Sequence, residues 1–142
     1  MGRQAARAAP SCKTLIMTAT NIYQPGVCNI GPAEIRQRRR LGWIGLAVSV
    51  VFLVLAVALG FPPAFRLLVA LPAGMAATGF LQGAFHFCVR FGTQGLFNFG
   101  EIGAEEAVHE TEYRKADQRK AVLIIVLSLA IAVVAAVVAF LV

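Results

Sequence analysis

Three long apolar runs, at residues 41–60, 64–87 and 121–142, constrain the fold more than any other feature. The first and third contain no charged residue, and Arg66 is the one charge in the second. Twenty residues of α-helix extend about 30 Å, which is the thickness of the hydrocarbon core of a bilayer. The chain is 58% hydrophobic, a value that a soluble domain rarely reaches. We therefore expect an all-α integral membrane fold with three transmembrane helices.

Proline and glycine mark the ends of these helices. The Gly-Pro-Ala-Glu motif at residues 31–34 is a favourable helix entry, because proline suits the first helical position and the glutamate faces the positive end of the helix dipole. The Phe-Pro-Pro motif at residues 61–63 ends the first span, and so short a turn predicts an antiparallel second span. Pro72 predicts a kink within that span. The chain thus divides into an irregular arm, residues 1–31, and a membrane domain, residues 32–142.

Basic residues gather at one end of the predicted helices. They are Arg36, Arg38, Arg39, Arg40, Arg90, Arg114, Lys115, Arg119 and Lys120. Arg66 alone falls at the other end, where it can reach the far headgroups. The positive-inside rule then places the arm and the loop at residues 88–120 in the cytoplasm and the C-terminus outside. The alanine, valine and arginine content favours a bacterial cytoplasmic (inner) membrane.

The net charge of +6 has the same explanation. Arg36, Arg38, Arg39 and Arg40 directly precede an apolar run, so we expect them to contact lipid headgroups. A docking site for an acidic partner is the alternative for this cluster. No recognition motif for nucleic acid appears, so membrane lipids are the expected partner of the basic residues.

The cytoplasmic loop contains its own charge pattern. Six of the seven acidic residues lie between Glu101 and Asp117, and basic residues follow them. That order suits the dipole of a helix over residues 101–120, which we expect to continue into the third span. The preceding segment, Phe91–Gly103, is dense in phenylalanine and glycine. We expect this segment to lie at the membrane surface or to be buried against a partner, with a flexible loop as the alternative.

The arm at residues 1–31 has no apolar core and is not a secretory signal peptide. Met17 opens a stretch that reads as a natural start, so residues 1–16 are interpreted as an over-extended N-terminus. Cys12, Cys28 and Cys88 show no regular spacing. In the predicted topology all three face the cytoplasm, so we expect three reduced, unconnected thiols.

The second span differs from the others because it contains small and polar residues at helical spacing. Gly79 and Gly83 form a Gly-x-x-x-Gly motif, which lets membrane helices approach closely. Thr78, Gln82 and His86 lie four residues apart beside it, and Arg90 extends the stripe. We expect Gly79, Gly83, Thr78 and Gln82 to contact another helix, within this chain or in a partner. A quinone carbonyl is an alternative hydrogen-bond partner for Thr78 and Gln82.

His86 is the candidate ligand for a cofactor. An imidazole at that depth, among phenylalanines, could bind a haem or a chlorophyll-type metal, whereas an ordinary interfacial histidine is the alternative. His86 and Cys88, with Cys28 or His109, make an incomplete zinc site. Glu106 and His109 are spaced as in one half of a di-iron motif, but we interpret them as part of a solvated helix. No metal site and no bound cofactor are therefore expected.

The motifs of nucleophilic, zinc-dependent and phosphate-binding enzymes are absent, so no enzymatic activity is expected. The leading hypothesis is a small non-catalytic subunit of a bacterial inner-membrane complex, such as a respiratory or photosynthetic electron-transfer assembly. Its partners would be other integral membrane subunits or further copies of itself. The alternatives are a cofactor- or lipid-binding membrane protein that uses His86, and an oligomeric channel or small transporter.

Overall fold

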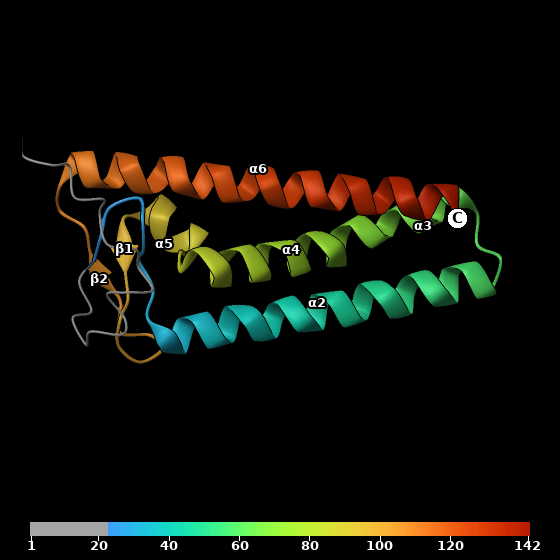
Figure 1. Ribbon diagram of the computed structural model, residues 1–142, viewed down its shortest axis with the longest axis horizontal. Helices are drawn as coiled ribbons and strands as arrows, with labels where there is room; N and C mark the ends of the chain where they lie inside the picture. The colour runs from blue at the N-terminus through green and yellow to red at the C-terminus, as the bar shows by residue number, and fades with distance from the viewer. Residues whose placement is uncertain (1–22) are drawn as a thin grey trace, which may run out of the picture.

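The computed structural model describes residues 23–142, so the interpretation of residues 1–16 falls outside the described part (Figure 1). Within it, three helical stretches are long and apolar enough to cross a membrane: Pro32–Ala58, Pro63–Phe85 and Thr111–Leu141. Their positions agree with the three predicted spans. The first and third are single helices, α2 and α6, whereas the second is assembled from three pieces.

Helix α2, Pro32–Ala58, begins at the predicted entry motif. Gly31 is the extended N-cap residue, proline occupies the first helical position, and Glu34 lies in the first turn. The helix ends near Gly60, whose φ of +69° is a left-handed conformation that favours glycine. In the turn that follows, Arg66 Nε donates a hydrogen bond to the carbonyl of Phe61 at 3.0 Å, which anchors this arginine at the far end of the bundle.

The second span consists of α3 (Pro63–Arg66), the 3₁₀ turn η1 (Leu67–Val69) and α4 (Ala70–Phe85). Pro72 lacks an amide hydrogen and cannot bond to the carbonyl four residues before it, so the tighter turn just upstream is a direct consequence. Helix α4 ends at Phe85, two residues before the predicted end. His86 is left-handed there, with φ 53° and ψ 37°.

The predicted helix over residues 101–120 is wrong in its first half. Helix α6 begins at Thr111 and continues without interruption to Leu141, as expected for its second half. Upstream, a short helix α5 (Val89–Gln94) is followed by strand β1 (Leu96–Phe97), which pairs antiparallel with β2 (Glu106–Ala107).

Two glycines in left-handed conformations break the helical pattern in this part of the chain. Gly95, with a φ of +70°, ends α5, and Gly103, with a φ of +98°, interrupts a helix within the connection between β1 and β2. The fold is therefore helical with a small two-stranded sheet at one end.

Helix α4 lies between α2 and α6, and both outer helices pack along it rather than along each other (Figure 1). The seam with α2 is built from glycines of both helices. A Cβ atom on Gly79 would lie 2.6 Å from the backbone nitrogen of Gly42, and one on Gly45 would lie 2.7 Å from that of Ala76. Gly79 therefore has the close helix contact that the Gly-x-x-x-Gly motif favours, and the contact is within this chain.

Residues 23–31 and 86–110 fold together over the end where α2 begins, and we call them the cap. Its residues Ile30, Cys88 and Phe91 form a hydrophobic cluster with Ile35 of α2. Phe91 is 1% exposed, so residues of this chain bury it. Phe97 stacks on Tyr23 with ring centroids 4.9 Å apart. We expected a partner to bury the phenylalanine-rich segment. The chain's own N-terminal arm thus provides part of that burial.

Candidate functional site

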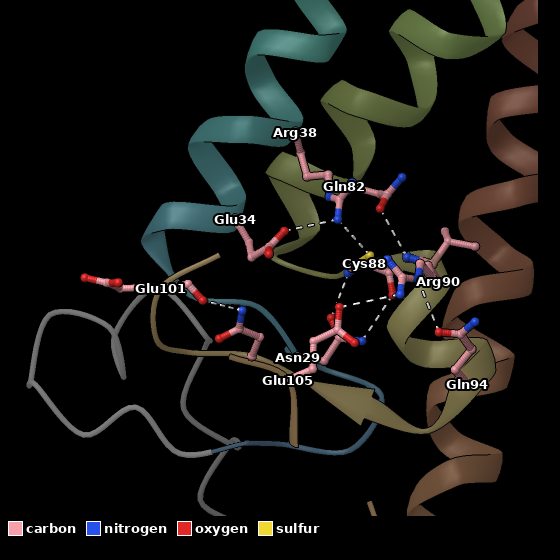
Figure 2. Close-up of polar contacts among 11 residues, drawn as sticks. Asn29, Glu34, Arg38, Gln82, Cys88, Arg90, Gln94, Glu101 and Glu105 are labelled. Atoms are coloured by element: carbon pink, nitrogen blue, oxygen red, sulfur yellow. Dashed lines mark hydrogen bonds and ion pairs between the residues drawn. The ribbon is translucent and has the colours of Figure 1, made fainter. Parts of the chain in front are cut away.

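The cap is held by a paired contact between Asn29 and Cys88 (Figure 2). The Oδ1 atom of Asn29 accepts a hydrogen bond from the backbone nitrogen of Cys88 at 2.7 Å, and its Nδ2 donates to the carbonyl of the same residue at 3.1 Å. Both residues are buried. The backbone of the arm continues this link, because Asn29 N donates to the carbonyl of His86 and Asn98 N donates to that of Asn29. The arm therefore acts as a partner strand for the turn between α4 and α5.

Arg38 links helix α2 to this turn. Its Nη2 atom lies 3.1 Å from Oε2 of Glu34, which is only 3% exposed, and donates to Sγ of Cys88 at 3.3 Å. Figure 2 shows the side chain of Arg38 directed into the cap. The neighbouring arginines of the predicted headgroup cluster differ: Arg36, Arg39 and Arg40 are exposed, and their contact with headgroups stays a prediction.

Gln82 closes the end of α4. Its side-chain Oε1 accepts a hydrogen bond from the backbone nitrogen of Val89 at 3.2 Å, and its backbone carbonyl accepts one from the backbone nitrogen of Phe87 at 3.0 Å. The side chain is buried, so it joins α4 to α5 within the chain. Neither the neighbouring-helix bond nor the quinone bond predicted for Gln82 is needed to satisfy this oxygen.

The predicted stripe of Thr78, Gln82, His86 and Arg90 is not continuous. Thr78 and Gln82 lie on α4, but His86 follows the helix end and Arg90 belongs to α5. The left-handed backbone at His86 turns the chain, so the four-residue spacing no longer keeps the side chains on one face. Thr78 donates to the carbonyl of Gly74 at 2.8 Å. Gly83 is covered by the side chain of Arg39, whose Cγ would lie 2.9 Å from a Cβ there.

A second buried polar contact joins the arm to α6 and was missed by the sequence analysis. Tyr23 donates its hydroxyl to Oδ2 of Asp117 at 2.6 Å, and the backbone nitrogen of Gly26 donates to Oδ1 at 2.7 Å. Asp117 is fully buried. Burial, followed by the hydrogen bond and the charge of Asp117, raises the pKa of the Tyr23 hydroxyl. In the sequence, Asp117 looks like any other acidic residue of the loop. The one signal is its spacing: Asp117 precedes Ile124 by seven residues, which places both on the same face of a helix.

Two of the apolar grooves between α4 and its neighbours bear on function. The first, which we call the alanine groove, has a volume of about 410 Å³. Alanines and one phenylalanine of α4 line it, with residues from both outer helices: Ala73, Ala76, Ala77, Phe80, Ala84, Leu46 and Ile131. The second, which we call the serine groove, has a volume of about 250 Å³. It is lined by Gly74 and Thr78 of α4 and by Ser128 and Ala132 of α6.

Ser128 is the unusual residue of the serine groove. It is 5% exposed, and its hydroxyl has no hydrogen-bond partner among residues 23–142. The other hydroxyls at similar depth behave differently, since Ser49 and Thr78 each donate to the carbonyl four residues earlier. A buried hydroxyl without a partner is costly in an apolar medium.

The candidate metal ligands come from different segments of the cap. Glu106 belongs to β2 and His109 precedes α6, so the expectation that they share a helix is wrong. Among the described residues, no group of three or more histidine, cysteine or acidic side chains could hold a metal ion. Cys28 and Cys88 are buried thiols, without a disulfide between them.

Compared with models of protein families, with curated proteins and with solved structures, the chain matches none of them. The functional interpretation therefore depends on the geometry of the cap and the two grooves.

Proposed function

We propose that this chain is a small non-catalytic, multi-pass membrane subunit that packs against partner helices in a bacterial inner-membrane complex. The arm would be cytoplasmic and the C-terminus outside, since the basic residues lie at the cap end. The arrangement of the helices supports a role in a larger assembly. In each of the three long helices only 22% of the most apolar stretch is buried. Broad apolar faces are thus available to lipid or to further helices.

The observation that carries the proposal is the buried hydroxyl of Ser128 in the serine groove. Gly74 and Thr78 line the same groove, so small and weakly polar side chains meet there. Such surfaces favour the close approach of a second helix in a membrane, and a polar group on that helix would satisfy the hydroxyl. The serine groove is therefore the proposed contact for a partner helix. It shares Thr78 with the face expected from the sequence but replaces Gly79, which packs against α2.

The test is purification from native membranes in a mild detergent, with quantitative mass spectrometry of the copurifying proteins. Gly74→Leu fills the serine groove, and Thr78→Val removes its hydroxyl with little change in shape. Both variants should lose most of the copurifying partner. Ala130→Leu, on an exposed face of α6, is the matched control and should retain it.

Unchanged partner stoichiometry in Gly74→Leu and Thr78→Val would show that the contact lies elsewhere. A protein that purifies alone would contradict the subunit proposal itself. The identity of the partners also tests the prediction of an electron-transfer assembly.

The cofactor hypothesis at His86 can be tested on the same sample by its absorption spectrum. A band in the visible region that disappears in His86→Ala would support this hypothesis instead. The channel hypothesis predicts solute flux when the purified protein is placed in liposomes.

A further inference from the structure

The alanine groove is apolar, and no polar group in it lacks a hydrogen-bond partner. Its floor is the face of α4 that carries Ala73, Ala77 and Ala84, and its volume is about 410 Å³. The one hydroxyl in it, that of Ser49, already donates to the carbonyl of Gly45 at 2.7 Å. An occupant of the groove must therefore be apolar along its length.

The end of the groove nearest the cap has two basic side chains beside it. Arg39 of α2 lies over Gly83, and Lys120 of α6 places Nζ 4.3 Å from the centre of the Phe85 ring. Gly83 and Phe85 directly precede and follow Ala84 in the sequence, and Ala84 is the last alanine of the groove floor. The two cations thus approach the same end of the groove from opposite outer helices.

Helical periodicity directs both cations to the side of the groove. Arg39 precedes the groove residue Leu46 by seven residues, and Lys120 precedes the groove residue Ile131 by eleven. Seven and eleven residues are close to two and three full helical turns, so each pair shares a face. The ion pairs among residues 23–142 use Arg38, Arg90 and Lys115, which leaves Arg39 and Lys120 without an acidic partner there.

We propose that the alanine groove binds an anionic phospholipid, with one acyl chain along the alanine floor and the phosphate between Arg39 and Lys120. This goes beyond the proposed function, although it depends on the same membrane-spanning arrangement. Anionic headgroups are attracted to basic side chains at the membrane surface. A partner helix is a poorer occupant, because the cytoplasmic ends of membrane helices are themselves rich in lysine and arginine and would be repelled.

The test is native mass spectrometry of the purified protein in detergent, titrated with phosphatidylglycerol or with phosphatidylcholine of the same acyl chains. The wild-type protein should bind phosphatidylglycerol more tightly. Replacing both cations, in Arg39→Gln/Lys120→Gln, should weaken that binding by roughly thirty-fold. The matched control is Arg40→Gln/Arg119→Gln, which removes the same charge one residue away on each helix, and it should change binding by less than roughly three-fold.

A second pair of variants tests the acyl-chain position. Ala84→Leu places a larger side chain on the exposed end of the floor and should abolish the phosphatidylglycerol adduct, whereas Ala130→Leu should preserve it. Circular dichroism of each variant verifies that the helices are intact. These measurements use the isolated protein, so their outcome is independent of whether partner subunits copurify.

Four results would overturn the proposal. The first is equal binding of phosphatidylglycerol and phosphatidylcholine by the wild type, and the second is equal loss in the two double variants. The third is an adduct that survives Ala84→Leu, since the acyl chain would then lie outside the groove. A protein dimer that disappears in Ala84→Leu would likewise place a second copy there instead of lipid.

Discussion

Asn29 and Cys88, 59 residues apart in the sequence, are joined by two hydrogen bonds between one side-chain amide and one backbone unit. The amide of Asn29 presents a donor and an acceptor, as a neighbouring strand would. It thereby satisfies the N–H of Cys88, which no helix bonds, and gives a second donor to its C=O, which also accepts from the backbone nitrogen of Gly92 in α5. The arm is thus a structural part of the cap.

Replacement of Asn29 by alanine should destabilise the protein. The change leaves the N–H of Cys88 buried without a partner, at a cost of about 1–3 kcal/mol, whereas its C=O still accepts from the backbone nitrogen of Gly92. The free energy of unfolding can be measured by circular dichroism during titration with a denaturing detergent. The alkylation rate of Cys88, followed by peptide mass spectrometry, should rise in parallel as the cap opens.

The control for this change is Gln94→Ala, which removes an exposed hydrogen bond to Arg90 and should cost less than about 0.5 kcal/mol. If Asn29→Ala unfolded at the same detergent concentration as the wild type, the pairing would contribute nothing to the cap.

Gly79 should not tolerate even a methyl group. In Gly79→Ala the added Cβ would meet the backbone of α2 at Gly42, which cannot move aside as a side chain can. We expect a loss of about 1–3 kcal/mol in the free energy of unfolding, as for other overpacked sites. Gly74→Ala on the same helix is the matched control, because its Cβ would meet only the Cβ of Ala132 at 3.4 Å. Equal stability of the two variants would mean that α2 and α4 are less closely packed than the glycines indicate.

The three spans were predictable because they depend on local composition. Length, hydropathy and the two prolines at residues 62 and 63 sufficed, and these features do not require knowledge of distant contacts. The entry of α2 was likewise visible, since capping preferences act within one helical turn. The continuation of α6 from a charged segment into the third span followed from the same kind of local pattern.

The cap was not predictable to the same degree, because its contacts join residues far apart in the sequence. The acidic order before residue 111 suggested a helix, whereas the left-handed Gly103 and the pairing of β1 with β2 give the chain another path there. Asn29 and Tyr23 read as ordinary polar residues of an irregular arm. Their partners, Cys88 and Asp117, are fixed by the tertiary fold, and no spacing rule connects them.

Arg38 and Glu34 should behave as a buried ion pair. Arg38→Gln leaves the carboxylate of Glu34, which is 3% exposed, without its guanidinium partner. We expect a loss of about 3 kcal/mol in the free energy of unfolding, because an uncompensated buried charge is costly. The double variant Glu34→Gln/Arg38→Gln removes both charges and should recover part of this loss.

The exposed pair of Glu112 and Lys115 provides the comparison. Glu112→Gln should change the free energy of unfolding by less than about 0.5 kcal/mol, as for other surface pairs. A double-mutant cycle on Glu34 and Arg38 measures their coupling directly. A coupling energy near zero would show that solvent reaches the pair and screens it.

Tyr23 should give the protein a characteristic alkaline instability. Burial and the adjacent Asp117 raise the pKa of its hydroxyl above the ordinary value of 10.0. Below about pH 10 the tyrosine is protonated in both the folded and the unfolded chain, so its contribution to stability is complete. Above that pH the unfolded chain loses the proton while the folded chain retains it. Stability must therefore fall as the pH rises.

The measurement is the free energy of unfolding between pH 8 and pH 11 for the wild type and for Tyr23→Phe. At pH 8 the variant should be less stable by about 1.5–3 kcal/mol, since the hydroxyl no longer donates to the buried carboxylate of Asp117. The difference between the two proteins should shrink towards pH 11, because the phenylalanine has no proton to lose. Tyr113→Phe, at an exposed position on α6, is the control; because Tyr113 makes the smallest contribution to the raised pKa of Tyr23, this variant should change the wild-type profile much less than Tyr23→Phe does. Parallel profiles for the wild type and Tyr23→Phe would show that Tyr23 ionises as freely in the folded protein as in the unfolded chain, and the contact with Asp117 would then be too weak to hold the arm on α6.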